Sequence, residues 1–93
     1  MGRYAPMNAQ AVVARNIRRL RVGRQLSQDT LAVDAGIDRT YVSRLERGRE
    51  NPTVAILEKL AIALDAEMSE FFRKPLRGEA APRPLRAGRR LGK

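Results

Sequence analysis

The sequence predicts an all-α fold of five short helices followed by a basic tail, and three observations predict it. Apolar residues recur at spacings of three and four between residues 9 and 72, which is the period of a helix that buries one face. Hydrophobic residues make up 43% of the 93 residues but aromatic residues only 4%, a balance that suits small aliphatic helices. Basic residues, prolines and glycines dominate from residue 73 onward, and that composition cannot form a core.

Each helix is predicted from its apolar stripe, taken in chain order. The stripes are Val13, Ile17 and Leu20 from residue 9 to about 23; Leu31 and Ala32 up to residue 35; Val42 and Leu45 within residues 38–47; Val54, Leu57, Leu60, Ala61 and Leu64; and Met68, Phe71 and Phe72 within residues 67–73. The fifth of these segments is expected to be short and to close the core.

Residues that favour helix ends separate these stripes. Ser27, Asp38 and Thr53 each precede a stripe, and their side chains can accept a hydrogen bond from a free N–H in the first helical turn. Gly36 and Gly48 follow stripes, where glycine adopts the left-handed conformation that ends a helix at no steric cost. The interval between the second and third helices is therefore a tight turn.

Charge divides the chain into a nearly balanced part and a basic part. The net charge is +9, and 16 of the 19 basic residues are arginine, which is the electrostatic pattern of a protein that binds a polyanion. We expect a flexible lead-in at residues 1–7, a folded domain at residues 8–73 and a disordered basic tail at residues 74–93. The tail is either a solvated extension or an arm that contacts phosphates.

Cysteine and histidine are both absent, which argues against several classes of function. Disulfides, zinc sites and the commonest general base are excluded, so we expect no enzyme, no metal and no cofactor. No apolar run reaches the length of a signal peptide or a membrane span, so we expect no membrane partner and a cytoplasmic protein, associated with the nucleoid when bound to DNA. A domain of this size is expected to have no ligand pocket and no small-molecule effector.

The order and spacing of the motifs resemble a known family. The matching elements are Ser27-Gln28, Leu31-Ala32, Ala35-Gly36-Ile37, Val42 to Gly48, Asn51-Pro52-Thr53 and Leu60-Ala61. Together they resemble the Cro/lambda-repressor (XRE-type) helix-turn-helix family over about residues 9 to 72. The resemblance implies a five-helix lambda-repressor-like DNA-binding domain. Two departures are Asp65, where the family usually has Gly, and Glu67, where a capping Ser, Pro or Asp is usual.

The resemblance implies a role for each residue around the third helix. Residues 38–47 would form the recognition helix, whose arginines can fork onto guanine O6 and N7 in the major groove. The implied base contacts are Arg39, Thr40, Ser43 and Arg44, and the implied phosphate contact is Gln28. Further candidates for phosphate contacts flank this helix, namely Tyr41, Arg47, Arg49 and Asn51, with a place in the core as the alternative for Tyr41. Glu46 would instead form a structural ion pair with Arg21.

The resemblance also implies a homodimer that binds double-stranded DNA at a near-palindromic operator as a transcriptional regulator, as a repressor or autoregulator. Met68, Phe71 and Phe72 are the candidate dimer-interface residues, with burial in their own subunit as the alternative. Within this class the protein could be an autonomous regulator, a controller of a restriction-modification operon or an antitoxin. The alternative from another class is a protein-interaction scaffold whose main partner is another protein.

Overall fold

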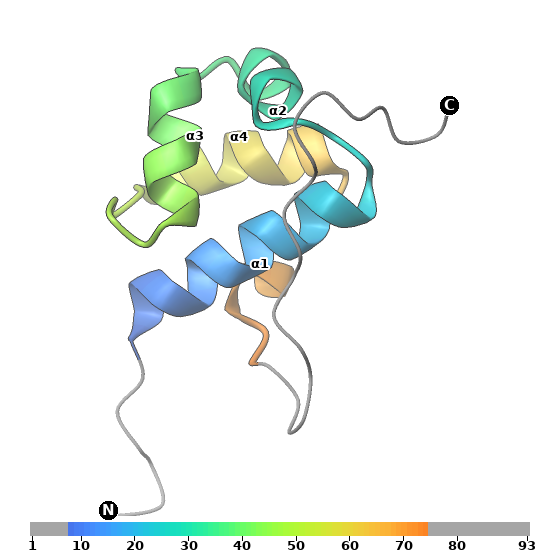
Figure 1. The fold of residues 1–93 in the computed structure, drawn as a ribbon. Coiled ribbons are helices and arrows are strands. Elements are labelled where there is room, and N and C mark those ends of the chain that lie inside the picture. Colours follow the sequence, from blue (N-terminus) through green and yellow to red (C-terminus); the bar gives the residue numbers. More distant parts are fainter. Residues whose placement is uncertain (1–7, 75–93) are drawn as a thin grey trace, which may run out of the picture.

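Four α-helices and one 3-10 helix follow one another along the chain in the computed structural model, which describes residues 8–74 (Figure 1). They are α1 (Ala9–Gly23), α2 (Gln28–Ala35), α3 (Arg39–Glu46), α4 (Val54–Leu64) and η1 (Met68–Phe72). The described residues contain no strand, so the predicted all-α class is confirmed. The predicted lead-in and all of the predicted tail after Lys74 lie outside the described residues.

The helices begin at the capping residues that the sequence predicts. The Ser27 hydroxyl accepts a hydrogen bond from the Thr30 amide at 3.0 Å. Asp38 does the same for Thr40 at the start of α3, and Thr53 does so at the start of α4. Each side chain satisfies a backbone donor that the first helical turn leaves without a partner.

Left-handed residues end α2 and α4. Gly36 has a φ of 71° at the end of α2, as predicted. Asp65 has a φ of 52° at the end of α4, so this residue adopts the left-handed conformation where the resembled family has glycine. Gln25, between α1 and α2, also has a positive φ, of 60°, and the sequence patterns did not indicate it.

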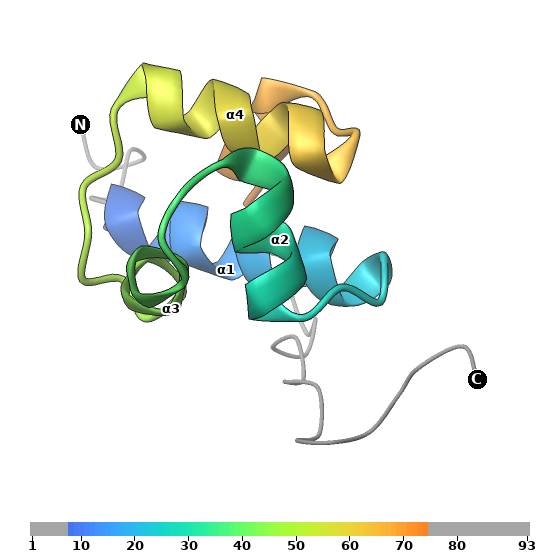
Figure 2. The same ribbon diagram turned by 90° about the horizontal axis from the view of Figure 1, so that it is seen from above.

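The helices enclose one apolar core, built from every predicted stripe. Its fully buried side chains include Ile17, Leu31, Val42, Leu60, Leu64 and Phe71. α1 contacts α3 and η1, whereas α2 contacts α3 and α4. Figure 1 and the view from above in Figure 2 show α3 standing at one side of the molecule, across the direction of α1. One side of α3 is consequently left uncovered.

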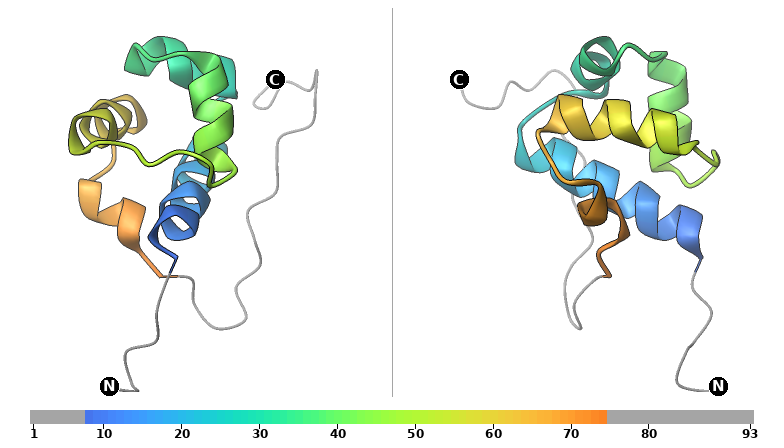
Figure 3. Two further views of the ribbon diagram at one scale, coloured as in Figure 1. Left: turned by 90° about the vertical axis from the view of Figure 1, so that its left-hand side faces the viewer. Right: turned by 180° about the vertical axis from the view of Figure 1, so that it is seen from behind.

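The fifth helix is a 3-10 helix rather than an α-helix. η1 has five residues and its preceding residue, Glu67, makes no side-chain cap, so little favours the longer α-helical pattern. The Asn16 side-chain amide of α1 fixes the segment instead. It donates hydrogen bonds to the carbonyl oxygens of Phe71 and Arg73, at 2.9 and 2.8 Å. The two views of Figure 3 show η1 beside α1.

Candidate nucleic-acid interface

Helix α3 presents a polar face to solvent and an apolar face to the core. Val42 and Leu45 are buried, since they occupy the inward positions of its stripe. Arg39, Thr40 and Arg44 are exposed, and Ser43 is partly buried. Three of the four candidate base contacts are thus fully accessible, and all four lie on the same short helix.

Two carboxylates outside α3 hold the exposed arginines of this face. Arg44 Nε donates to Glu50 Oε2 at 2.6 Å, and Glu50 lies in the loop that follows α3. Arg39 Nε lies 2.8 Å from Asp29 Oδ1, and Asp29 lies in the first turn of α2. Neither pairing was predicted from the sequence, because each joins residues whose proximity depends on how α3 docks against its neighbours.

The inner side of α3 carries a buried carboxylate. Glu46 Oε2 accepts from Arg21 Nε at 2.6 Å and Glu46 Oε1 accepts from Arg21 Nη2 at 2.9 Å, so the guanidinium binds the carboxylate in a bidentate manner. Arg21 also donates to the carbonyl oxygen of Leu26 at 2.8 Å. The ion pair implied by the resemblance is thus present, and it joins α1 to α3.

Gln28 belongs to the same network. Its Nε2 donates to Glu46 Oε1 at 3.1 Å, and its side chain is partly buried at the start of α2. Arg18 Nε lies 3.5 Å from the same Glu46 oxygen. The Glu46 carboxylate, at the C-terminal end of α3, therefore contacts side chains of both α1 and α2. The candidate phosphate contact Gln28 is oriented by that carboxylate.

The remaining candidate phosphate contacts surround the end of α3. Arg47, Arg49 and Asn51 are exposed at the C-terminal end of α3 and in the following loop. Tyr41 is partly buried and packs against the core. Burial, and secondly the negative charge of Glu50, raise the pKa of the Tyr41 hydroxyl above its usual value of 10.0. A tyrosine hydroxyl is protonated at neutral pH in any case, so it can donate a hydrogen bond there.

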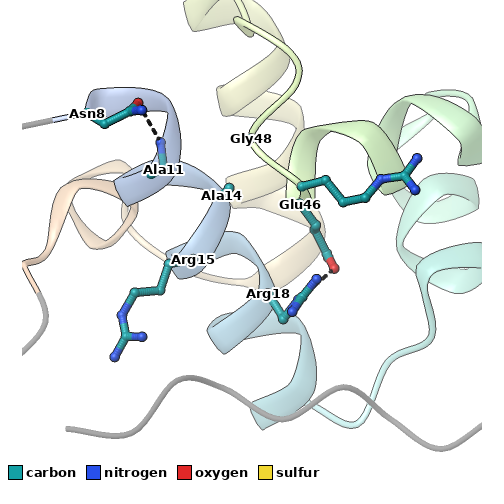
Figure 4. A pocket seen from close by; sticks show the side chains of 8 residues that line it. Asn8, Ala11, Ala14, Arg15, Arg18, Glu46 and Gly48 are labelled. Atoms are coloured by element: carbon teal, nitrogen blue, oxygen red, sulfur yellow. Dashed lines mark hydrogen bonds and ion pairs between the residues drawn. The ribbon is translucent and has the colours of Figure 1, made fainter.

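An open hollow lies between α1 and the end of α3, whereas the expectation that the domain has no ligand pocket stays a prediction. Its volume is about 380 Å³. Its lining consists of Asn8, Ala11, Ala14, Arg15, Arg18, Glu46, Arg47 and Gly48. Figure 4 shows Arg18 directed toward Glu46, and Arg15 extending from the same helix. The Glu46 charge already has Arg21 as a partner, so the lining is positively charged overall.

The two phenylalanines of η1 differ in burial, since one lies in the core and the other on the surface. Phe71 has no exposed surface and belongs to the core, so its assignment to a dimer interface is corrected in favour of burial in its own subunit. Phe72 is 52% exposed, and Met68 is partly buried. Ile62 of α4, which the sequence patterns did not single out, is 75% exposed.

Ile62 and Met68 lie in a second hollow, along α4 and η1. This hollow has a volume of about 670 Å³. Its lining consists of Glu58, Ala61, Ile62, Asp65, Ala66, Glu67 and Met68. The lining combines apolar side chains with three carboxylates and includes Met68 of the predicted dimer face.

These features define a class: an all-α domain in which two short helices, α2 and α3, are joined by a tight glycine turn and the second of them has an open polar face. A family model described as helix-turn-helix matches residues 17–71, more than half of the chain. The chain belongs to the helix-turn-helix family of DNA-binding transcriptional regulators, of the Cro/lambda-repressor (XRE) type.

Individual relatives agree with this assignment. A hypothetical transcription factor of Neisseria meningitidis is 42% identical over 66 residues, which cover 71% of this chain but only 62% of that protein. The restriction-modification controller protein C.AhdI from Aeromonas hydrophila is 43% identical with a TM-score of 0.66, over 68% of this chain and 96% of that one. The controller C.Esp1396I, solved as a tetramer on its natural 35 base-pair operator, is 30% identical with a TM-score of 0.66, over 72% and 88%.

None of the helices within residues 8–74 combines the length and the apolar character that a membrane span requires.

Proposed function

We propose that this protein binds one specific double-stranded DNA operator through α3 and thereby regulates transcription, as a repressor or autoregulator. The observation that carries the proposal is the outward face of α3, on which Arg39, Thr40 and Arg44 are exposed while Val42 and Leu45 anchor the helix from beneath. The guanidinium group of arginine and the hydroxyl of threonine can form hydrogen bonds with the edges of base pairs in the major groove.

The side chains on and around α3 support separate roles in contacting bases and phosphates. Arg39, Thr40, Ser43 and Arg44 would read bases. Phosphates on either side would be held by Gln28 at the start of α2 and by the groups on and after α3, namely Tyr41, Arg47, Arg49 and Asn51. Phosphate contacts fix the position of a protein on the duplex, whereas base contacts determine its sequence preference. The Arg21–Glu46 pair would keep α3 at a constant angle to α1.

We further propose that the protein acts as a homodimer on a near-palindrome, with recognition helices about 34 Å apart to reach successive turns of the major groove. The hollow along α4 and η1, with exposed Ile62 and Phe72 nearby, supports this surface as the dimer interface. Several relatives are controller proteins of restriction-modification systems, which supports control of such an operon as one specific role.

Selection from random duplex DNA tests the proposal. The purified protein is incubated with the duplex pool at near-physiological salt, bound duplexes are amplified and sequenced, and Arg44→Ala is selected in parallel. We expect an enriched inverted repeat for the wild type and a relaxed preference at one base pair of each half-site for the variant. Absence of any enriched sequence, with binding that weakens steeply as salt rises, would contradict the proposal and favour a protein-binding scaffold.

A further inference from the structure

The two carboxylates that hold Arg39 and Arg44 do so at one particular atom. In both pairs the arginine contributes Nε: Arg44 Nε to Glu50 Oε2 at 2.6 Å and Arg39 Nε to Asp29 Oδ1 at 2.8 Å. A guanidinium has five N–H donors, and only one of them is on Nε. The structure records no hydrogen bond of the terminal nitrogens of either arginine within residues 8–74, so these nitrogens remain available to a ligand.

Both carboxylates belong to residues outside α3 whose backbone has contacts of its own. The backbone carbonyl of Glu50 accepts a hydrogen bond from Gln10 Nε2 of α1 at 2.8 Å, and the Glu50 side chain is only 23% exposed, against 50% for Arg44. Asp29 lies in the first turn of α2, close behind the capping residue Ser27. Each of the two long arginine side chains is thus paired with a residue outside α3, in the following loop or in α2.

The two ion pairs contribute little to the stability of the fold. Exposed ion pairs contribute little because water screens them and because two long side chains must be immobilised. The Asp29–Arg39 pair is exposed on both sides, at 70% and 65%. An effect on the ligand that the arginines bind is the better explanation of two similar pairs on one recognition face.

We propose that Glu50 and Asp29 are positioning residues that determine sequence specificity: each holds its arginine by Nε, leaves the two terminal nitrogens for guanine O6 and N7, and cancels a charge that would attract any phosphate. This inference rests on the proposed function. An arginine already held in place loses less conformational freedom on binding a base. A neutralised arginine also contributes less to sequence-independent attraction, which depends on net positive charge.

The test compares Glu50→Gln and Asp29→Asn with control variants that remove the same charge elsewhere. Asp34→Asn and Asp34→Gln on α2 are suitable controls, because Asp34 is exposed and pairs with neither Arg39 nor Arg44. Affinity is measured over a range of salt concentrations for a duplex enriched by the selection above and for a scrambled duplex of equal length. Thermal unfolding of every variant verifies that the fold is retained.

We expect both positioning variants to bind the scrambled duplex more tightly, with the slope of log affinity against log salt steeper by about 0.9 for each arginine that gains a phosphate. Their ratio of specific to scrambled affinity should fall by about tenfold, the size of one bidentate base contact. The controls should retain the wild-type ratio. In an Arg44→Ala background, Glu50→Gln should have no further effect on the ratio.

Each outcome distinguishes this inference from the proposed function. A variant that keeps the wild-type ratio overturns the role of that carboxylate, and controls that lose as much discrimination as the two variants overturn both roles. A wild-type protein that binds the enriched and scrambled duplexes equally would overturn the proposed function itself, and this inference with it.

Discussion

Glu46 is the residue that contributes most to the attachment of the C-terminal end of α3 to α1. Its side chain has no exposed surface, and that of Arg21 is only 5% exposed, so the Arg21 charge depends on Glu46 for compensation. Removing one partner of a buried pair leaves a charge without water or counterion, which costs several kcal/mol, whereas removing both can be nearly neutral.

Replacing Glu46 alone should therefore destabilise the domain far more than replacing the pair. We expect Glu46→Leu to lower the free energy of unfolding by about 3–5 kcal/mol, and the double variant Arg21→Met, Glu46→Leu to recover much of that loss. Urea unfolding followed by circular dichroism measures both. The exposed Arg49→Met is the control. A loss in the single variant no greater than that in the control would show that the pair is not energetically important.

For individual residues, the sequence predicted which kind of role a side chain has better than it predicted which other side chain it contacts. Arg21 and Glu46 could be paired because the family resemblance supplies their spacing. The contacts of Gln28 with Glu46 and of Asn16 with η1 could not be found, since each depends on side-chain conformation and on the docking of distant segments.

The helices themselves were predictable because their ends are encoded locally. Side-chain caps and the glycine after α2 act within a few residues, so the sequence alone locates the boundaries. The conformation of η1 is not encoded in this way. Its five residues are too few to form a stable α-helix alone, and their conformation is fixed by Asn16 from α1.

Asn16 should accordingly control how firmly η1 is attached. Asn16→Ala would leave the buried carbonyl of Phe71 without its donor, at a cost of about 1–3 kcal/mol in stability. We expect hydrogen exchange to accelerate at the amides of η1 more than at those of α2 and α3. The exposed Asn51→Ala is the matched control. Uniform acceleration across all helices would contradict a local attachment.

The turn between α1 and α2 contains strain that one substitution can relieve. Gln25 is exposed and has a φ of 60°, a conformation that costs a residue with a Cβ atom about 1 kcal/mol relative to glycine. Gln25→Gly should raise the thermal midpoint slightly, because the larger freedom of glycine in the unfolded chain offsets part of the gain. Gln25→Ala removes the same side chain without relieving the strain, so an equal gain from alanine would refute this explanation.

Two large apolar side chains, one on α4 and one on η1, are exposed and can be tested for a role in self-association. Ile62 is 75% exposed and Phe72 52% exposed. We expect Ile62→Lys and Phe72→Lys to weaken dimerisation at least tenfold in sedimentation equilibrium, since each would bury a charge at the interface. Val33 on α2 is 78% exposed, and Val33→Lys serves as the control. Equal effects of all three variants, or a wild type that remains monomeric with and without DNA, would contradict the proposed dimer face.

The segment after Lys74 contributes charge to the molecule, and its contribution to DNA affinity can be measured. Residues 75–93 carry six basic residues and one acidic residue. If they bind phosphates, deleting them should reduce the slope of log affinity against log salt by about 0.9 for each phosphate that they neutralise, without altering the preferred sequence. An unaltered slope would indicate that the segment is a solvated extension.

The position of Tyr41 has a practical consequence for optical measurements. The chain contains no tryptophan and only two tyrosines, of which Tyr41 lies on α3 beside Glu50. Its emission is therefore not masked by indole fluorescence, and in a Tyr4→Phe protein it would come from α3 alone. The domain thus contains an intrinsic fluorophore at the surface that we propose contacts DNA, so binding can be followed in the otherwise unlabelled protein.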